Sequence, residues 1–513
     1  MVNYTVVKNR KNNILIRGVN WIGDAVMSMP AIYAIRHSHP DSHISLLIKP
    51  FVAPLFENNP SIDEIIIYDD SHKGIFGKFR LARMLRKKRF QKAILLQNAV
   101  DAALTVFLAG IPERIGYDSD ARGFLLTHKI PQDRLDRKIH HIDYYLNLLK
   151  NAGLDSVSAR PWIYLTLEER ESARQTLSQL RRPILGINPG ATYGSAKRWM
   201  PERFAEVAKW FQMETGGSIV IFGGKNEVGI AQEIDKHIFD SKLFLAGSTG
   251  LRELAALISE CDVFVTNDSG PMHMADALIT PLVAIFGSTS PELTGPTSPN
   301  THVLYSRVSC RPCFDRTCGL GDLRCMSMVR PDEVFFKIKE GLPTKKAVFF
   351  DRDGTLCRDA DYLNQWEGLE IFEDIKSIKK LKEAGYVLIG VSNQSGIKRG
   401  IVNEEFTKSV NEKFINEYGF DDFFYCPHGP DDGCSCRKPE PAMALWARAK
   451  HRIDFKKSFV VGDKDADMLL GKNIGAKTVL VKTGKQQSSE YADMVCDNLV
   501  QLVEEILKNE EGN

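Results

Sequence analysis

The chain has 513 residues, of which 43% are hydrophobic and 26% are charged, values that predict an ordinary globular protein of three or four domains. Its formal net charge of +2 argues against a nucleic-acid partner, and its apolar runs fall short of the ~20 residues that span a bilayer. The start, Met1 to Asn13, is polar and basic, unlike a secretory signal. We therefore expect a cytoplasmic protein.

The first part of the chain predicts an α/β domain with a parallel sheet. Strand-like runs at 13–17, 43–48, 64–68 and 93–96 alternate with helix-length stretches, as in parallel sheets. The loop after the first run, 18–24, contains two glycines that permit a tight turn and close approach of a ligand. A plain strand-to-helix turn would explain such a loop equally well. The following helix is expected over 25–37.

The string G-x-x-W-I-G-D-A-V-M-S-M-P, which starts at Gly18, resembles the N-terminal signature of family 9 glycosyltransferases, the lipopolysaccharide heptosyltransferases. Residues 110–117 resemble a second stretch of that family, near its acceptor side. The resemblance implies that Asp24 is the general base that deprotonates the acceptor hydroxyl. The alternative is that this carboxylate caps a helix.

A basic segment lies between Lys73 and Lys92, with nine Lys or Arg, no acidic residue, and apolar residues such as Phe79 and Leu81. It is either a solvated helix face or a surface that meets anionic membrane lipid or an acidic lipid-linked saccharide. Together with the family resemblance, this suggests a lipid-linked saccharide acceptor and peripheral contact with the inner membrane.

A second alternating unit follows, with strands expected at 183–188, 218–222 and 262–266 and a helix at 201–212. The loop 189–199 combines small residues with Lys197, and free N–H groups beside a lysine suit a diphosphate. The third strand leads into the string N-D-S-G-P-M-H, which starts at Asn267.

That string, with F-G-S-T-S-P at 286–291, resembles the donor-binding half of the same family. The resemblance implies the GT-B architecture, two Rossmann-like domains facing across a cleft, with ADP-heptose as donor. Fixed N–H groups and a lysine would meet the charge on the departing diphosphate, so no metal is demanded there. The implied donor-binding residues are Thr192, Lys197, Asp268, Ser269, Gly270 and His273. The alternative for 268–273 is a capped helix with a core histidine.

Seven of the ten cysteines fall in two tight clusters, a pattern of metal sites more than of a disulfide framework. The first has the spacing C-x2-C-x4-C-x6-C and comprises Cys310, Cys313, Cys318 and Cys325. It is compatible with one tetrahedral zinc or with incidental thiols. A helix from Pro331 and the stretch 341–343 then lead to the last domain.

The last domain opens with an apolar run, 347–350, that predicts a buried strand, followed by D-R-D-G-T-L from Asp351. Two carboxylates at the carboxyl end of a strand lie where open α/β sheets bind ligands. The run resembles the first motif of haloacid-dehalogenase (HAD) phosphohydrolases. By that resemblance Asp351 attacks phosphorus and Asp353 is the general acid/base. Two solvated aspartates in a turn are the alternative.

The remaining HAD motifs follow in order: strand 388–391 with a hydroxyl at its end, then R-K-P at 437–439, then strand 459–462 with acids at its end. Lysine is a point charge for phosphate, and carboxylates bind Mg²⁺. The implied phosphate-binding residues are Ser392, Asn393, Arg437 and Lys438. The implied magnesium ligands are Asp351, Asp353 (through its main-chain carbonyl) and Asp463.

The second cysteine cluster has the pattern C-x-H-x5-C-x-C and comprises Cys426, His428, Cys434 and Cys436. These ligands suit a closed structural zinc, with a disulfide pair as the alternative. The zinc loop resembles the subgroup that contains D-glycero-D-manno-heptose 1,7-bisphosphate phosphatases and histidinol-phosphate phosphatases. Its short x5 spacing is that of the histidinol type, and no large cap insertion fits between the motifs.

We therefore expect an α/β chain with GT-B domains at 1–178 (acceptor) and 179–343 (donor), followed by a capless, Rossmannoid HAD-type phosphatase with a zinc loop at 344–513. The two resemblances imply one pathway: inverting transfer of heptose to the lipopolysaccharide inner core, and removal of the 7-phosphate of heptose bisphosphate through an aspartyl-phosphate. Three alternatives stay open: histidinol phosphate as the phosphatase substrate, another nucleotide sugar as donor, or a non-catalytic saccharide-binding first half.

Overall fold

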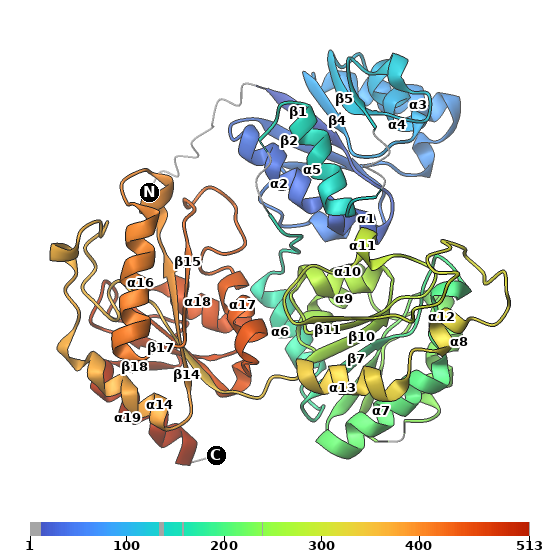
Figure 1. Ribbon diagram of the computed structural model, residues 1–513. Coiled ribbons are helices and arrows are strands. Elements are labelled where there is room, and N and C mark those ends of the chain that lie inside the picture. Colours follow the sequence, from blue (N-terminus) through green and yellow to red (C-terminus); the bar gives the residue numbers. More distant parts are fainter. Residues whose placement is uncertain (1–11, 133–137, 156–158, 239, 512–513) are drawn as a thin grey trace. The chain divides into compact units, whose positions relative to one another are not determined.

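The computed structural model describes residues 12–132, 138–155, 159–238 and 240–511. Most of the polar start of the chain therefore lies outside the described residues. The chain divides into two compact units, residues 1–340 and 341–513. The first unit contains two six-stranded sheets and the second contains one, all of parallel strands (Figure 1). Among the described residues, no helix is long and apolar enough to cross a membrane.

The first sheet has the strand order β3-β2-β1-β4-β5-β6. Its strands are β1 (Asn13–Arg17), β2 (His43–Ile48), β3 (Glu64–Ile67), β4 (Lys92–Leu95), β5 (Glu113–Asp118) and β6 (His128–Pro131). One face packs against α1 (Ile22–Met27), α2 (Met29–Ser38) and α5 (His141–Asn151), and the other against α3 (Gly74–Lys87) and α4 (Val100–Leu108). The helix expected over 25–37 is interrupted at Ser28, because Pro30 has no N–H to continue the helix.

The second sheet has the order β12-β11-β10-β7-β8-β9. Its strands are β7 (Ile184–Asn188), β8 (Ser218–Ile221), β9 (Lys242–Phe244), β10 (Val263–Asn267), β11 (Leu282–Ile285) and β12 (Thr301–Leu304). Its helices are α6 (Leu167–Thr176), α7 (Pro201–Thr215), α8 (Val228–Asp235), α9 (Leu251–Ser259), α10 (Gly270–Ala277), α11 (Pro291–Thr294), α12 (Arg324–Ser327) and α13 (Pro331–Gly341).

The third sheet has the order β15-β14-β13-β16-β17-β18. Its strands are β13 (Ala347–Phe350), β14 (Val387–Asn393), β15 (Asp422–Cys426), β16 (Phe459–Gly462), β17 (Lys477–Val481) and β18 (Met494–Cys496). Its helices are α14 (Lys379–Glu383), α15 (Ser395–Lys398), α16 (Glu404–Tyr418), α17 (Ala442–His451), α18 (Asp465–Ile474) and α19 (Leu499–Glu511).

In each sheet the chain starts at an inner strand, β1, β7 or β13, and later strands add on either side of it. The order reverses beside that strand, so the loops after its two neighbours diverge and leave a crevice at the carboxyl edge. The α/β class with parallel sheets is confirmed, and the loops after β1, β7 and β13 are where ligands are expected.

Candidate active sites

A buried lysine joins two carboxylates at the carboxyl edge of the third sheet. Asp351 follows β13, and its Oδ1 lies 2.7 Å from Lys438 Nζ. The same ammonium group lies 2.6 Å from Asp467 Oδ1 and donates to the carbonyl of Val391 at 2.8 Å. Burial opposes the charge of Lys438, but Asp351 and Asp467 outweigh it and raise its pKa. The lysine is therefore held as a cation beside the predicted nucleophile.

Three buried acids form a group suited to a divalent cation. One carboxylate oxygen from each of Asp351, Asp463 and Asp467 lies within 4.8 Å of the others. Burial, and next the charge of Asp351, raise the pKa of Asp463; among the described residues its buried Oδ1 has no hydrogen-bond partner. Burial also raises the pKa of Asp467 to about 7, against the effect of Lys438. Clustered carboxylate oxygens are the ligands that Mg²⁺ prefers.

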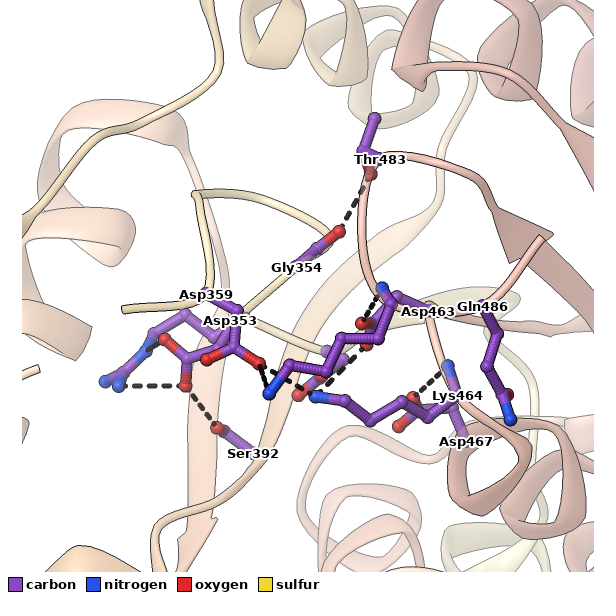
Figure 2. A network of polar contacts seen from close by, with 12 residues as sticks. Asp353, Gly354, Asp359, Ser392, Asp463, Lys464, Asp467, Thr483 and Gln486 are labelled. Atoms are coloured by element: carbon purple, nitrogen blue, oxygen red, sulfur yellow. Dashed lines mark hydrogen bonds and ion pairs between the residues drawn. The ribbon is translucent and has the colours of Figure 1, made fainter. Parts of the chain in front are cut away.

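A glycine makes room for this acidic group. Gly354 has φ +93°, and a Cβ there would lie 2.5 Å from Asp463 Oδ2. Asp463 also accepts a hydrogen bond from the N–H of Lys485 at 2.9 Å. Thr483 Oγ1 donates to the carbonyl of Gly354 at 2.8 Å, and this tie is visible in Figure 2. The D-x-D-G-T motif therefore needs its glycine for both conformation and space.

Asp353, the predicted general acid/base, is held by neutral and charged donors. Arg352 donates to its two oxygens through Nε and Nη2, each at 3.1 Å. Gln394 Nε2 donates to Oδ2 at 2.7 Å and to Ser392 Oγ at 2.7 Å. Figure 2 shows Asp353 and Ser392 facing each other. Gln394 was not among the predicted site residues, although it directly follows the predicted residues Ser392 and Asn393 in the sequence.

Two of the predicted phosphate-binding residues, Asn393 and Arg437, form hydrogen bonds within the protein. The Asn393 side chain accepts from the N–H of Lys438 at 3.0 Å and donates to its carbonyl at 3.2 Å, so it positions the lysine. Arg437 Nη1 donates to the carbonyl of His428 at 3.3 Å. Both border a cavity of about 670 Å³ whose wall includes Asp351, Asp353, Ser392, Gln394, Lys438 and Asp467.

The rim of the cavity carries an ion-pair group that sequence reasoning missed. Lys464 and Lys485 lie 3.3 and 3.0 Å from Asp359 Oδ2. Lys485 also pairs with Asp361 at 3.0 Å. Lys464 could have been found from the sequence, because it stands among the acids that follow strand 459–462 in the fourth HAD motif. Asp359 and Lys485 lie outside every motif. The role of the Asp353 carbonyl as a magnesium ligand stays a prediction. Asp467, which was not a predicted ligand, lies with Asp351 and Asp463 in the acidic group.

The second cysteine cluster comes together at the end of β15. Cys434 Sγ lies 3.6 Å from both Cys426 Sγ and Cys436 Sγ. His428 Nδ1 lies 3.6 Å from Cys426 Sγ and 3.3 Å from Cys436 Sγ. These separations are close to the edges of a tetrahedron, about 3.8 Å, that Zn–S bonds of roughly 2.3 Å define. They are far beyond the about 2.05 Å of a disulfide.

The first cysteine cluster behaves differently. Cys310 and Cys313 are exposed, Cys318 is half-buried and Cys325 is buried. Within the part of the chain that the structure describes, these four thiols do not form a metal-binding group like the two above. Their loop packs on the donor loop, where Arg316 O accepts from the N–H of Ala196 at 3.0 Å. Burial, and next the charges of Cys310, Cys318 and Cys313, raise the pKa of Cys325. The four thiols therefore lie in one neighbourhood, and the choice between one zinc and incidental thiols stays open.

In the second sheet, one ion pair dominates the predicted donor site. Lys197 Nζ lies 2.5 Å from Asp268 Oδ2, which also accepts from Thr289 Oγ1 at 2.5 Å. Ser269 Oγ lies 3.2 Å from Thr266 Oγ1, and Thr192 is exposed on the loop after β7. The predicted donor residues thus gather around the carboxyl ends of β7 and β10.

Within the first unit, α1 beside the first sheet contacts α10 beside the second sheet. A Cβ on Gly23 would lie 2.7 Å from His273 Cδ2, so only glycine permits this approach. His273 is buried; burial lowers its pKa against the opposing effect of Asp268 and other carboxylates, which leaves a neutral imidazole. Asp24, beside Gly23, is half-buried and its Oδ1 lies 3.5 Å from His141 Nδ1.

Asp24 lines a cavity of about 370 Å³ at the carboxyl edge of the first sheet. Sequence reasoning predicted only Asp24 there. The other walls come from Trp21, Asn98, Gln132, His141, Tyr144 and Tyr145. These residues follow three different strands or lie on α5. Trp21 stands in the same family string as Asp24, whereas the other five belong to no motif that would have singled them out.

Comparison with known proteins assigns both units. The family described as glycosyltransferase family 9 (heptosyltransferase) matches residues 78–323, and the family described as HAD-hydrolase-like matches residues 435–502. Lipopolysaccharide heptosyltransferase 2 of Escherichia coli K12 is 33% identical over 307 residues, covering 57% of this chain and 87% of the relative. The D-glycero-beta-D-manno-heptose-1,7-bisphosphate 7-phosphatase of Helicobacter pylori J99 is 37% identical over 170 residues, covering 32% of this chain and 98% of the relative.

The solved structure of E. coli ADP-heptose LPS heptosyltransferase II has a TM-score of 0.56 and 28% identity, and covers 64% of this chain and 98% of its own. Fold and sites thus define an enzyme that combines a glycosyltransferase with a phosphatase. The chain belongs to glycosyltransferase family 9, the heptosyltransferases, and continues into a HAD-like phosphatase. The predicted fusion of these two families is confirmed.

Proposed function

We propose that this chain is a bifunctional enzyme of lipopolysaccharide core heptose metabolism. It transfers heptose from ADP-heptose to the inner core with inversion, and it removes the 7-phosphate of D-glycero-D-manno-heptose 1,7-bisphosphate. The observation that carries the proposal is that one chain covers 87% of a heptosyltransferase relative and 98% of a heptose bisphosphatase relative. Residues 1–178 would bind the acceptor, 179–343 the donor and 344–513 the sugar phosphate, in the cytoplasm.

In the phosphatase half, Asp351 forms a bond to phosphorus while the bond from phosphorus to the sugar oxygen breaks. Asp353 gives its proton to that oxygen, then takes a proton from the water that attacks the aspartyl-phosphate, which releases phosphate and restores Asp351. Lys438 and Ser392 hold the phosphoryl oxygens. The buried Lys438–Asp351 contact of 2.7 Å supports this assignment, because it places a fixed cation where the phosphate charge must be met.

Two metals fit the residues present. Asp351 and Asp463 would hold Mg²⁺ with the carbonyl of Asp353, and the grouping of Asp467 with them supports an acidic metal site. When bound, Mg²⁺ offsets the repulsion between the carboxylate and the phosphate. Zn²⁺ would be structural, held by Cys426, His428, Cys434 and Cys436. The segment between β13 and β14 contains only 3-10 turns and the short helix α14, which supports a capless active site.

In the transferase half, Asp24 would take the proton of the acceptor hydroxyl as its oxygen attacks the anomeric carbon. The diphosphate leaves from the opposite face, so the configuration inverts. Lys197 and the N–H groups at the start of α10 would meet the charge that develops on it. The approach of Gly23 to His273 supports this proposal, because Asp24 on α1 then lies close enough to His273 on α10 for its charge to affect that histidine.

Phosphate release with Mg²⁺ tests the proposal, with heptose 1,7-bisphosphate and histidinol phosphate as parallel substrates. We expect a strong preference for the bisphosphate; a preference for histidinol phosphate would break the shared pathway. ADP release from ADP-heptose in the presence of an inner-core acceptor tests the other half, with other nucleotide sugars as competitors. Sugar transfer that survives in Asp24→Ala would favour a different base, and no transfer by the wild type would favour a saccharide-binding module.

A further inference from the structure

Helix α3 carries an unusual outward surface. Its buried residues, among them Leu81, Ala82 and Leu85, pack against the first sheet and α4. The opposite side exposes large apolar side chains: Ile75 is 73% exposed, Phe76 87% and Phe79 57%. A monomeric protein seldom presents adjacent aromatic residues so fully to water. This side of α3 is therefore suited to a partner that accepts apolar groups.

Basic side chains continue the same side of the helix. At 3.6 residues per turn, Arg80, Arg83 and Lys87 fall on the arc that also holds Phe76 and Phe79. All three cations are exposed. In the described chain, none of the three forms an ion pair with a carboxylate. We call these six residues, Ile75, Phe76, Phe79, Arg80, Arg83 and Lys87, the outer face of α3.

The basic residues beside the outer face are already used. Lys78 pairs with Asp101, Lys88 with Glu64, and Arg86 Nη2 donates to the carbonyl of Leu108 at 2.7 Å. These contacts anchor the helix to its neighbours. The side chains of the outer-face cations, in contrast, form no hydrogen bond or ion pair with the other described residues, so their charge is available to an anionic partner.

We infer that the outer face of α3 docks on an anionic lipid bilayer. Apolar residues in the first two turns and cations from Arg80 onward match an interfacial helix, whose aromatic residues enter the acyl boundary while arginine and lysine contact the headgroups. A protein partner would need acidic groups placed to match each cation. A bilayer presents negative charge at high density without that requirement.

The location of the outer face links it to the cavity that Asp24 lines. The start of α3 lies beside the start of α4, because Lys78 pairs with Asp101 in the first turn of α4; Figure 1 shows the two helices side by side. Helix α4 begins just after Asn98, which lines the cavity that contains Asp24. Docking would therefore bring this cavity near the lipid surface. That last step rests on the proposed function, whereas lipid binding itself does not.

Vesicle co-sedimentation of the full chain, without donor or acceptor, tests the inference. We expect binding to phosphatidylcholine vesicles that contain phosphatidylglycerol, weak binding to phosphatidylcholine alone, and release at high salt. Phe76→Ser/Phe79→Ser should weaken binding at least about tenfold. Arg80→Gln/Arg83→Gln/Lys87→Gln should weaken it about a hundredfold, at roughly fivefold for each charge. The matched control is Met213→Ser, because Met213 is 82% exposed on α7.

Each result decides the inference. No binding to anionic vesicles, or equal binding by the outer-face variants and the wild type, would overturn it. A dimer that forms without lipid and disappears in Phe76→Ser/Phe79→Ser would also overturn it, by assigning the face to a second copy of the chain. Transfer to a delipidated acceptor should be unchanged in both variants, which separates lipid docking from folding and from the proposed activity.

Discussion

The proposed phosphatase site and the proposed donor site both lie at the carboxyl edge of a parallel sheet, but they differ in charge. Around Asp351 the structure groups three buried acids and a buried lysine. Around the donor loop it places one ion pair, Lys197 with Asp268. A carboxylate that attacks phosphorus must overcome repulsion between anions, whereas a departing diphosphate needs only donors for its charge. The proposed site that attacks phosphorus therefore carries more charged groups than the proposed site from which a diphosphate departs.

The largest expected effect is the loss of one activity while the other activity is unchanged. Asp351→Asn keeps the shape of the side chain but removes the nucleophile, so phosphate release should fall about ten-thousandfold, or about 5.5 kcal/mol. Sugar transfer should be unchanged, and Asp24→Asn should give the reverse pattern. Parallel assays of phosphate and ADP release check this. Loss of both activities in either variant would contradict independent sites.

Removal of zinc should affect only the phosphatase half. We expect a loss of unfolding free energy on the order of 4 kcal/mol, less than the roughly 10–16 kcal/mol of isolated zinc fingers, because the loop adjoins a folded sheet. Metal content before and after treatment with a chelator, together with the thermal transition of each half, measures it. Zinc-free protein with an unchanged transition would refute a structural role. Cys310→Ser is the control and should leave the zinc content unchanged.

The same substitution in both sites sharpens the comparison. Lys438→Met leaves Asp351 and Asp467 buried without their cation, which should cost about 3–5 kcal/mol in stability. Lys197→Met should cost about 1–2 kcal/mol, because Asp268 keeps its bond from Thr289. Hydrogen exchange of β13 and β7 reports each half separately. Equal losses would show that the two lysines are equally important for folding.

The smallest expected effect concerns the contact between α1 and α10 in the first unit. Gly23→Ala places a methyl group 2.7 Å from His273, so α1 must shift and sugar transfer should fall about tenfold. Gly229→Ala on α8 is the matched control, because its Cβ would have nothing within 4 Å. Phosphate release should be unchanged in both. Full sugar transfer in Gly23→Ala would show that this close approach is dispensable.

Much of the phosphatase site could be predicted because its motifs are local. Asp351 and Asp353 follow one strand, Ser392 ends another and Asp463 follows a third, so strand ends alone bring them to one edge. Asp467 was not predicted as a site residue, because the fourth motif contains three aspartates at 463, 465 and 467 and the sequence does not say which of them face the site. Only the turn of α18 decides which of them faces inward: Asp467 is buried against Gly462, whereas Asp465 is half-exposed.

Most of the cavity that contains Asp24 could not be predicted, because only the loop from Val19 to Asp24 belongs to a motif. Its tyrosines and His141 lie on α5, more than a hundred residues beyond the first motif, and have no distinctive spacing. The basic segment was visible in the sequence as charge. Its aromatic residues could equally have packed inward, since a helix with apolar residues on two sides does not say which side meets the core.

The sequence by itself determined the three parallel sheets, the order of the motifs and the two families, because periodicity and strand ends are encoded locally. Only the tertiary structure decided which side chains meet. Lys438 reaches Asp351 across 87 residues, His273 rests against Gly23, and the aromatic residues of α3 face outward. Such pairings depend on strand register and on the packing of helices against sheets, which join distant segments that no local pattern connects.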